Sequence, residues 1–165
     1  MSIDIFKKAG LFVVLVLAQA LVCNHIHLFG YATPLIYVYF VLLFRREYPH
    51  WAVLVWSFLL GLVIDIYSNT PGVGAASMTF LGMVQPYLLI PFLPRDTEGD
   101  FQPSIRTLGL NKFLWYTILL VFLYCLIFFS LEAFSFFNWQ EWLLTMLAST
   151  LLTVLLIIVI ANLKI

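Results

Sequence analysis

The sequence is short of charge. Lys, Arg, Asp and Glu make up 10% of its 165 residues, and hydrophobic residues make up 64%. Soluble domains carry about 25% charged and about 45–50% apolar residues. A water-soluble fold of this length could not cover its surface with so few polar side chains. The shortage excludes a soluble domain and predicts a chain whose outer face contacts membrane lipid.

An excess of one charge sign is also missing. The formal net charge is zero, so no basic surface points to a nucleic-acid partner. The two cysteines, Cys23 and Cys125, lie in different apolar segments and in no C-x-x-C or Cys/His metal pattern. We expect two reduced thiols packed among helices.

The sequence patterns of common enzymes are absent. It has no H-E-x-x-H, no G-x-S-x-G and no glycine-rich phosphate loop. An intramembrane aspartyl protease needs a second acid beside the first, and Asp65 has none. His25 and His27 are two residues apart and point to opposite sides of a helix. We therefore expect a protein without catalytic residues, cofactor or metal.

Long apolar runs are abundant. A hydrocarbon core of about 30 Å requires about 20 helical residues, and six runs approach this length. The shortest of them starts close to Pro34, which suits the first turn of a helix. We predict an all-α, polytopic membrane domain over residues 1–165, with spans at 9–27, 31–44, 51–66, 75–93, 113–131 and 142–161.

The basic residues test this assignment. Six spans would place all eight of them on one side of the membrane: Lys7, Lys8, Arg45, Arg46, Arg95, Arg106, Lys112 and Lys164. The opposite loops, near 24–30, 67–74 and 132–141, contain no Lys or Arg. Because Lys and Arg gather on the cytoplasmic side of inner-membrane proteins, both termini are predicted to be cytoplasmic.

The first span also has features of a cleavable signal peptide. Lys7 and Lys8 precede an apolar run, which is followed by Ala18-Gln19-Ala20. The apolar stretch continues past this small-residue site instead of meeting a polar sequence. We therefore expect the segment to be retained as a span.

Asp65 is the only carboxylate well inside a predicted span. A charge at membrane depth costs several kcal/mol, so such a residue is a functional hypothesis by default. Ser57, Gly61 and Asp65 follow one another at i, i+4 and i+8, which places two small residues and the acid on one helix face. That face should contact protein, because small residues allow helices to approach closely.

A tight turn follows, and it includes Asn69 and Gly72. The next span opens with small residues from Ala75 onward, so the third and fourth spans are predicted to form a close-packed hairpin. Two roles for Asp65 remain open: it caps or hydrogen-bonds the turn that follows, or it belongs to a pocket or partner contact. The candidate structural or partner-contact residues are Ser57, Gly61, Asp65, Asn69 and Gly72.

The loop before the last span is rich in aromatic residues: Phe134, Phe136, Phe137, Trp139 and the adjoining Trp142. Trp is common at the headgroup level of membranes, so an aromatic belt is one interpretation. A docking surface for another membrane protein is the other.

The segment 57–73 resembles the signature of the rod shape-determining protein MreD. That family has a glycine, an aspartate four residues later, a small-residue turn with glycine and an alanine-rich helix start, which Gly61, Asp65, Gly72 and Ala75-Ala76 match. The stretches 21–34, 103–110 and 131–136 resemble members of the Bacteroidetes type, and the likeness covers nearly the whole chain. Two positions depart from it, as Gly74 stands where many members carry histidine, and Gln85 where arginine is frequent.

The resemblance implies a non-catalytic part of the elongation complex in the bacterial inner membrane. Such a protein binds MreC, works beside MreB, RodA and the elongation transpeptidase, and helps to organise lateral peptidoglycan synthesis and cell shape. The MreD fold is in turn similar to the substrate-binding subunits of energy-coupling-factor transporters, so a vitamin-type carrier is the alternative. The A-x-x-x-A pattern expected in the first span of such carriers is absent, since Val22 stands four residues after Ala18.

Overall fold

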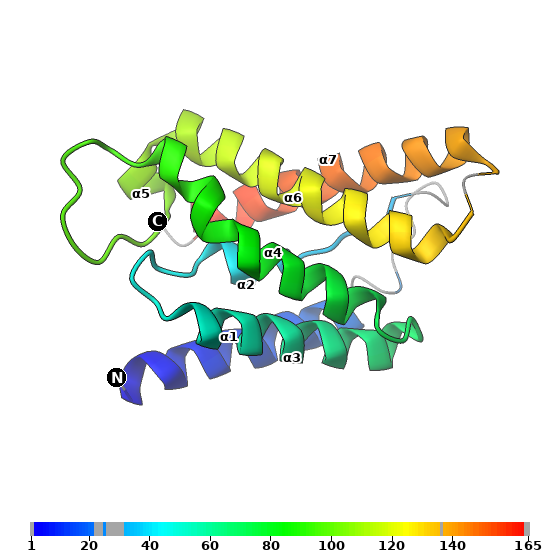
Figure 1. Cartoon of the computed structure of the whole chain (residues 1–165), viewed down its shortest axis with the longest axis horizontal. Helices are drawn as coiled ribbons and strands as arrows, with labels where there is room; N and C mark the ends of the chain where they lie inside the picture. Colours follow the sequence, from blue (N-terminus) through cyan, green and yellow to red (C-terminus); the bar gives the residue numbers. More distant parts are fainter. Residues whose placement is uncertain (1, 22–24, 26–31, 136, 164–165) are drawn as a thin grey trace.

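The regular elements of the protein are helices. The computed structural model describes residues 2–21, 25, 32–135 and 137–163 (Figure 1). The elements are α1 (Ser2–Leu21), α2 (Val38–Leu42), α3 (His50–Ser68), α4 (Val73–Leu89), the 3-10 turn η2 (Ile90–Phe92), α5 (Ile105–Leu108), α6 (Leu110–Ala133) and α7 (Trp139–Leu163). The predicted all-α class is confirmed.

Four helical stretches of the described chain are long and apolar enough to cross a membrane: His50–Ser68, Val73–Phe92, Leu110–Ala133 and Trp139–Leu163. They contain the third to sixth predicted spans almost entirely, and most begin or end a few residues beyond the expected bounds. Large apolar side chains such as Phe58, Met83 and Leu151 are exposed on their outer faces. Lipid is the solvent that suits such faces, which indicates a membrane protein.

α1 corresponds to the first predicted span but begins seven residues earlier. With 20 residues it is about as long as the two shorter apolar stretches, yet Asp4, Lys7 and Lys8 occupy its first two turns, and it is not among the four. Its buried side chains, including Gln19, face the rest of the bundle, and it packs against α3. Residues 22–24, 26 and 27 of the predicted span lie outside the described residues.

A continuous helix over 31–44 was predicted, and this prediction is wrong. The described part of that segment is non-helical from 32 to 35, and α2 has only five residues. Pro34 and Ile36 bond to Gln19 near the end of α1, whereas Arg45 reaches Asp4 near its start, so the segment runs antiparallel to α1. Non-helical backbone advances up to about 3.3 Å per residue against 1.5 Å in a helix, so a short segment covers this distance.

This segment is also the core of the bundle. Tyr37 and Val38 are completely buried, and every residue from 37 to 42 is at most 3% exposed. Non-helical backbone is tolerated at membrane depth only where protein surrounds it and supplies hydrogen-bond partners. Gln19 supplies two of them, since its Nε2 donates to the Pro34 carbonyl oxygen at 2.9 Å and its Oε1 accepts from the Ile36 amide at 3.1 Å.

α7 supplies two further hydrogen-bond partners for the backbone of this segment. The Thr33 amide donates to Ser149 Oγ at 3.1 Å, and the Leu35 amide donates to Thr153 Oγ1 at 3.1 Å. Ser149 and Thr153 are four residues apart, so both hydroxyls project from one face of α7. The segment is therefore held between α1 and α7 by side chains that replace the missing helical hydrogen bonds.

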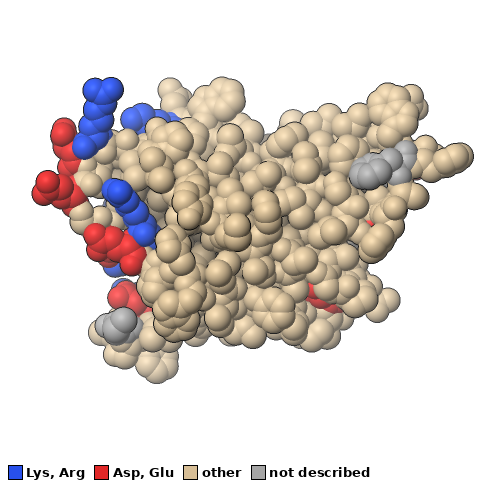
Figure 2. All heavy atoms as spheres, in the orientation of Figure 1, with Lys and Arg blue, Asp and Glu red and all other residues tan. Residues whose placement is uncertain are grey.

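The connection between α4 and α6 contains one turn of helix, α5, which lies between Pro103 and Gly109. Ser104 begins α5 and forms a reciprocal capping box with Thr107. On the face shown in Figure 2, the Lys and Arg side chains gather at one end of the molecule, where α1 and α3 begin and where this connection lies. This is the distribution that the loop charges predicted.

Candidate functional site: the α3–α4 hairpin

α3 and α4 pack on each other more extensively than any other two helices. Gly61 lies at their closest approach, because a Cβ atom there would be 2.5 Å from the Gly74 carbonyl oxygen and 2.6 Å from Ala75 Cα. These are backbone atoms, so α4 would have to move away. Ser57, Gly61 and Asp65 are all buried. The predicted close-packed hairpin, with this face turned toward protein, is confirmed.

α4 contributes glycines of its own that the sequence reasoning missed. A Cβ at Gly82 would be 2.6 Å from Ser57 Oγ, and one at Gly74 would be 2.5 Å from Asp65 Oδ1. Gly74 and Gly82 are eight residues apart, which puts them on one helix face opposite Ser57 and Asp65. This eight-residue spacing of glycines could have indicated from the sequence that α4 has a small-residue face. The Ser57 hydroxyl is buried without a hydrogen-bond partner in the described structure.

The Asp65 carboxylate closes the start of α4. Its Oδ1 accepts from the Gly74 amide at 2.8 Å and from Thr70 Oγ1 at 3.0 Å, and its Oδ2 accepts from the Ala75 amide at 2.9 Å. The first amides of a helix have no partner within the helix and carry the positive end of its dipole. Gly72, at the N-cap, has no side chain to serve them. A carboxylate from the preceding helix therefore does the capping.

The turn residues have a different role. Asn69 ends α3 with φ 57°, and Gly72 begins α4 with φ 85°, both in the left-handed region that favours these residue types. Both are exposed. The structure therefore brings Ser57, Gly61 and Asp65 together at the helix contact, while Asn69 and Gly72 shape the chain reversal beside it.

The two departures from the MreD pattern are explained locally. Gly74 donates its amide to Asp65, and any side chain there would require the carboxylate to shift. Gln85 is buried in α4, where its Nε2 donates to the Tyr116 hydroxyl at 2.9 Å and to the Phe44 carbonyl oxygen at 3.4 Å. It thereby ties α4 to α6 and to the end of the buried segment.

The aromatic loop connects α6 and α7 at the end of the bundle away from the N-terminus (Figure 1). Phe134 and Phe137 are 88% and 92% exposed, and Trp139 is 57% exposed. Trp142 is half-buried and packs against the core, and Phe136 lies outside the described residues. Such exposure agrees with an aromatic belt and with a docking surface, and the choice between them stays a prediction.

The other residue types considered for chemistry are scattered. No three His, Cys, Asp or Glu side chains of the described chain come close enough to hold a metal ion. Cys125 is a buried free thiol and His25 is exposed. Cys23 and His27 lie outside the described residues.

Comparison with known proteins identifies no relative. No protein-family model matches the chain, and no curated protein and no solved structure matches it either.

Replacing Gly61 by alanine should lower the stability of the protein. The added methyl group meets the α4 backbone at 2.5 Å, and overpacking of this kind typically costs about 1–3 kcal/mol. Gly10→Ala in α1 is the matched control, because its Cβ meets nothing within 4 Å and alanine favours a helix by about 1 kcal/mol. Thermal unfolding in lipid nanodiscs should show a lower midpoint for Gly61→Ala only. Equal midpoints would contradict the close contact.

Proposed function

We propose that this protein is a non-catalytic component of the bacterial elongation complex. In this proposal it resides in the inner membrane, binds MreC, and works with MreB, RodA and the elongation transpeptidase to organise lateral peptidoglycan synthesis and cell shape. The observation that supports the proposal most strongly is that the residues matching the MreD signature form one structural unit. Gly61 allows the helix contact, Asp65 caps α4 and Gly72 reverses the chain.

The hairpin also supports a way of binding MreC. Gly61 and Asp65 are turned toward the α3–α4 contact, and we place a membrane helix of the partner on the opposite face of the hairpin. Large exposed apolar side chains lie on that face, including Phe58 and Ile66 of α3 and Phe80 and Met83 of α4. Helices associate in lipid through van der Waals packing of their lateral faces. We propose that a membrane helix of MreC packs against this face, with the aromatic loop as a second contact.

The proposed topology has six passes with both termini in the cytoplasm. Four passes are the apolar helices α3, α4, α6 and α7; the other two are α1 and the buried segment that returns along it. The gathering of Lys and Arg at one end (Figure 2) supports placing that end inside. The likeness to the fold of energy-coupling-factor substrate-binding subunits stays part of this proposal.

This topology is tested by cysteine labelling. In a background without Cys23 and Cys125, Pro71→Cys places a thiol in the exposed turn before α4, and Glu98→Cys places one in the exposed connection after it. A membrane-impermeant maleimide added to spheroplasts should label position 71 and leave position 98 unlabelled until the membrane is opened. The reverse pattern would contradict the proposed orientation.

The partner is tested by co-purification. Tagged protein extracted in mild detergent should recover MreC. Phe80→Ala with Met83→Ala should lower that recovery several-fold, because hot-spot side chains carry most of an interface's binding energy. Phe134→Ser with Phe137→Ser tests the aromatic loop, and recovery that is unchanged would favour the belt interpretation.

Leu151→Ala is the control for these variants, since Leu151 is 70% exposed on α7 and outside both proposed contacts. It should leave recovery unchanged. Failure of the wild-type protein to recover any MreC would overturn the proposed function.

A carrier for a small molecule is the second candidate, and one observation favours it. A pocket of about 590 Å³ opens beside the hairpin turn and is lined by Gln19, Tyr37, Thr70 and Glu132 among others. Its volume is within the range of small-ligand sites. Recovery of a bound vitamin, or of an ATPase module in place of MreC, would favour the carrier.

A further inference from the structure

A larger pocket lies at the opposite, charged end of the molecule. It encloses about 860 Å³ between the start of α1, the connection from α2 to α3, and residues Asp100 and Gln102. One wall is apolar, with Leu11, Phe40 and Leu43, and the rim carries charges of both signs. All of its lining residues belong to the described chain, and the MreC proposal does not use them.

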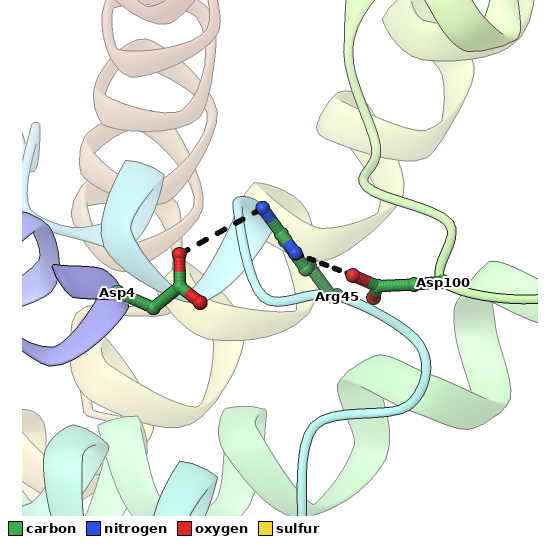
Figure 3. A network of polar contacts seen from close by, with 3 residues as sticks. All are labelled: Asp4, Arg45 and Asp100. Carbon is green, nitrogen blue, oxygen red and sulfur yellow. Dashed lines mark hydrogen bonds and ion pairs between the residues drawn. The ribbon is translucent and has the colours of Figure 1, made fainter. Parts of the chain in front are cut away.

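Arg45 joins the three segments that form the pocket. Its guanidinium forms ion pairs with Asp4 of α1, at 4.0 Å, and with Asp100 of the α4–α5 connection (Figure 3). The Asp100 pair is also a hydrogen bond. Two carboxylates therefore neutralise the Arg45 guanidinium. These ion pairs hold together the three segments that line the pocket.

Lys8 has no such partner. Its side chain is half-buried, and its ammonium lies over the Tyr48 ring, 2.9 Å from the centroid, and 4.9 Å from that of Phe44. It forms no ion pair with a carboxylate of the described chain. Burial and the positive charge of Arg45 lower the pKa of Lys8 to about 8, while the Asp4 and Asp100 carboxylates act in the opposite direction. A cation held in this way is stabilised by an incoming anion.

The level of the pocket relative to the membrane surface indicates the source of that anion. Trp51, 71% exposed, lies in the first turn of α3 and lines the pocket, and exposed Trp is typical of the headgroup level of a membrane. The pocket combines apolar side chains such as Leu11 and Leu43 with charged side chains such as Lys7 and Lys8. An amphiphile with a phosphate and a hydrocarbon chain matches both parts.

We propose that this pocket binds a phospholipid, with its phosphodiester on Lys8 and Lys7 and the start of an acyl chain along Leu11 and Leu43. Lys7 is exposed on the rim and supplies a second cation. The bound lipid would join α1 to the α2–α3 connection at the membrane surface. A phosphate group accepts charge-assisted hydrogen bonds from ammonium groups, and these are stronger than hydrogen bonds between neutral groups.

The test is a titration of the purified full-length protein in detergent with dioctanoyl-phosphatidylglycerol, followed by native mass spectrometry. Lys8→Gln should weaken binding roughly tenfold, the effect of one charge-assisted hydrogen bond. Lys8→Arg should retain most of it. Lys112→Gln is the matched control, since it removes the same charge from an exposed position at the start of α6 outside the pocket.

Three results would overturn the proposal. Equal binding by Lys8→Gln and wild-type protein would exclude the site. An equal weakening by Lys112→Gln would show a general charge effect. Competition by inorganic phosphate at the same concentration as the lipid would identify free phosphate as the ligand. If Lys8→Gln does not fold, Leu11→Trp fills the apolar wall without changing charge, and it should also weaken binding; undiminished binding would contradict the site.

Discussion

A backbone amide or carbonyl buried in lipid must find a partner within the protein, and this requirement explains the unusual features of the bundle. Asp65 reaches from α3 to the first amides of α4, where the N-cap residue Gly72 has no side chain to accept their hydrogen bonds. Gln19, Ser149 and Thr153 serve the segment where the chain is not helical. These buried polar side chains therefore have a structural role, which is to form hydrogen bonds with backbone groups that lack a helical partner.

The arrangement leaves few surfaces on which the protein can act. Its most polar interior groups are occupied with one another, as Gln85 is with Tyr116 and Tyr37 with Tyr124. The accessible features of the described chain include the lateral helix faces, the aromatic loop and a pocket at each end. A component that organises partners within the membrane needs surfaces of this kind, and the lipid proposed at Lys8 would act on the charged end alone.

The sequence predicted the local features well and the distant ones poorly. Ser57, Gly61 and Asp65 lie within one helix at i, i+4 and i+8. Their spacing in the sequence was therefore enough to predict the close-packed hairpin. The run 31–44 looked like another span because composition does not distinguish a buried helix from a buried irregular segment. Its partners, Gln19 and Ser149, come from helices at opposite ends of the chain, and no single-sequence pattern indicates such a contact. Partner binding is not a property of one chain's sequence pattern, so it stays a proposal.

Amide hydrogen exchange in lipid nanodiscs tests the central claim most directly. The Thr33, Leu35 and Ile36 amides should exchange as slowly as those in the middle of α6, because each is bonded to a side chain inside the bundle. Gln19→Leu should accelerate exchange at Ile36, whereas the same change at exposed Gln140 should not. If these three amides exchange in the wild-type protein as fast as those of the exposed residues Arg95, Asp96 and Gly99, the segment is not buried and paired as described.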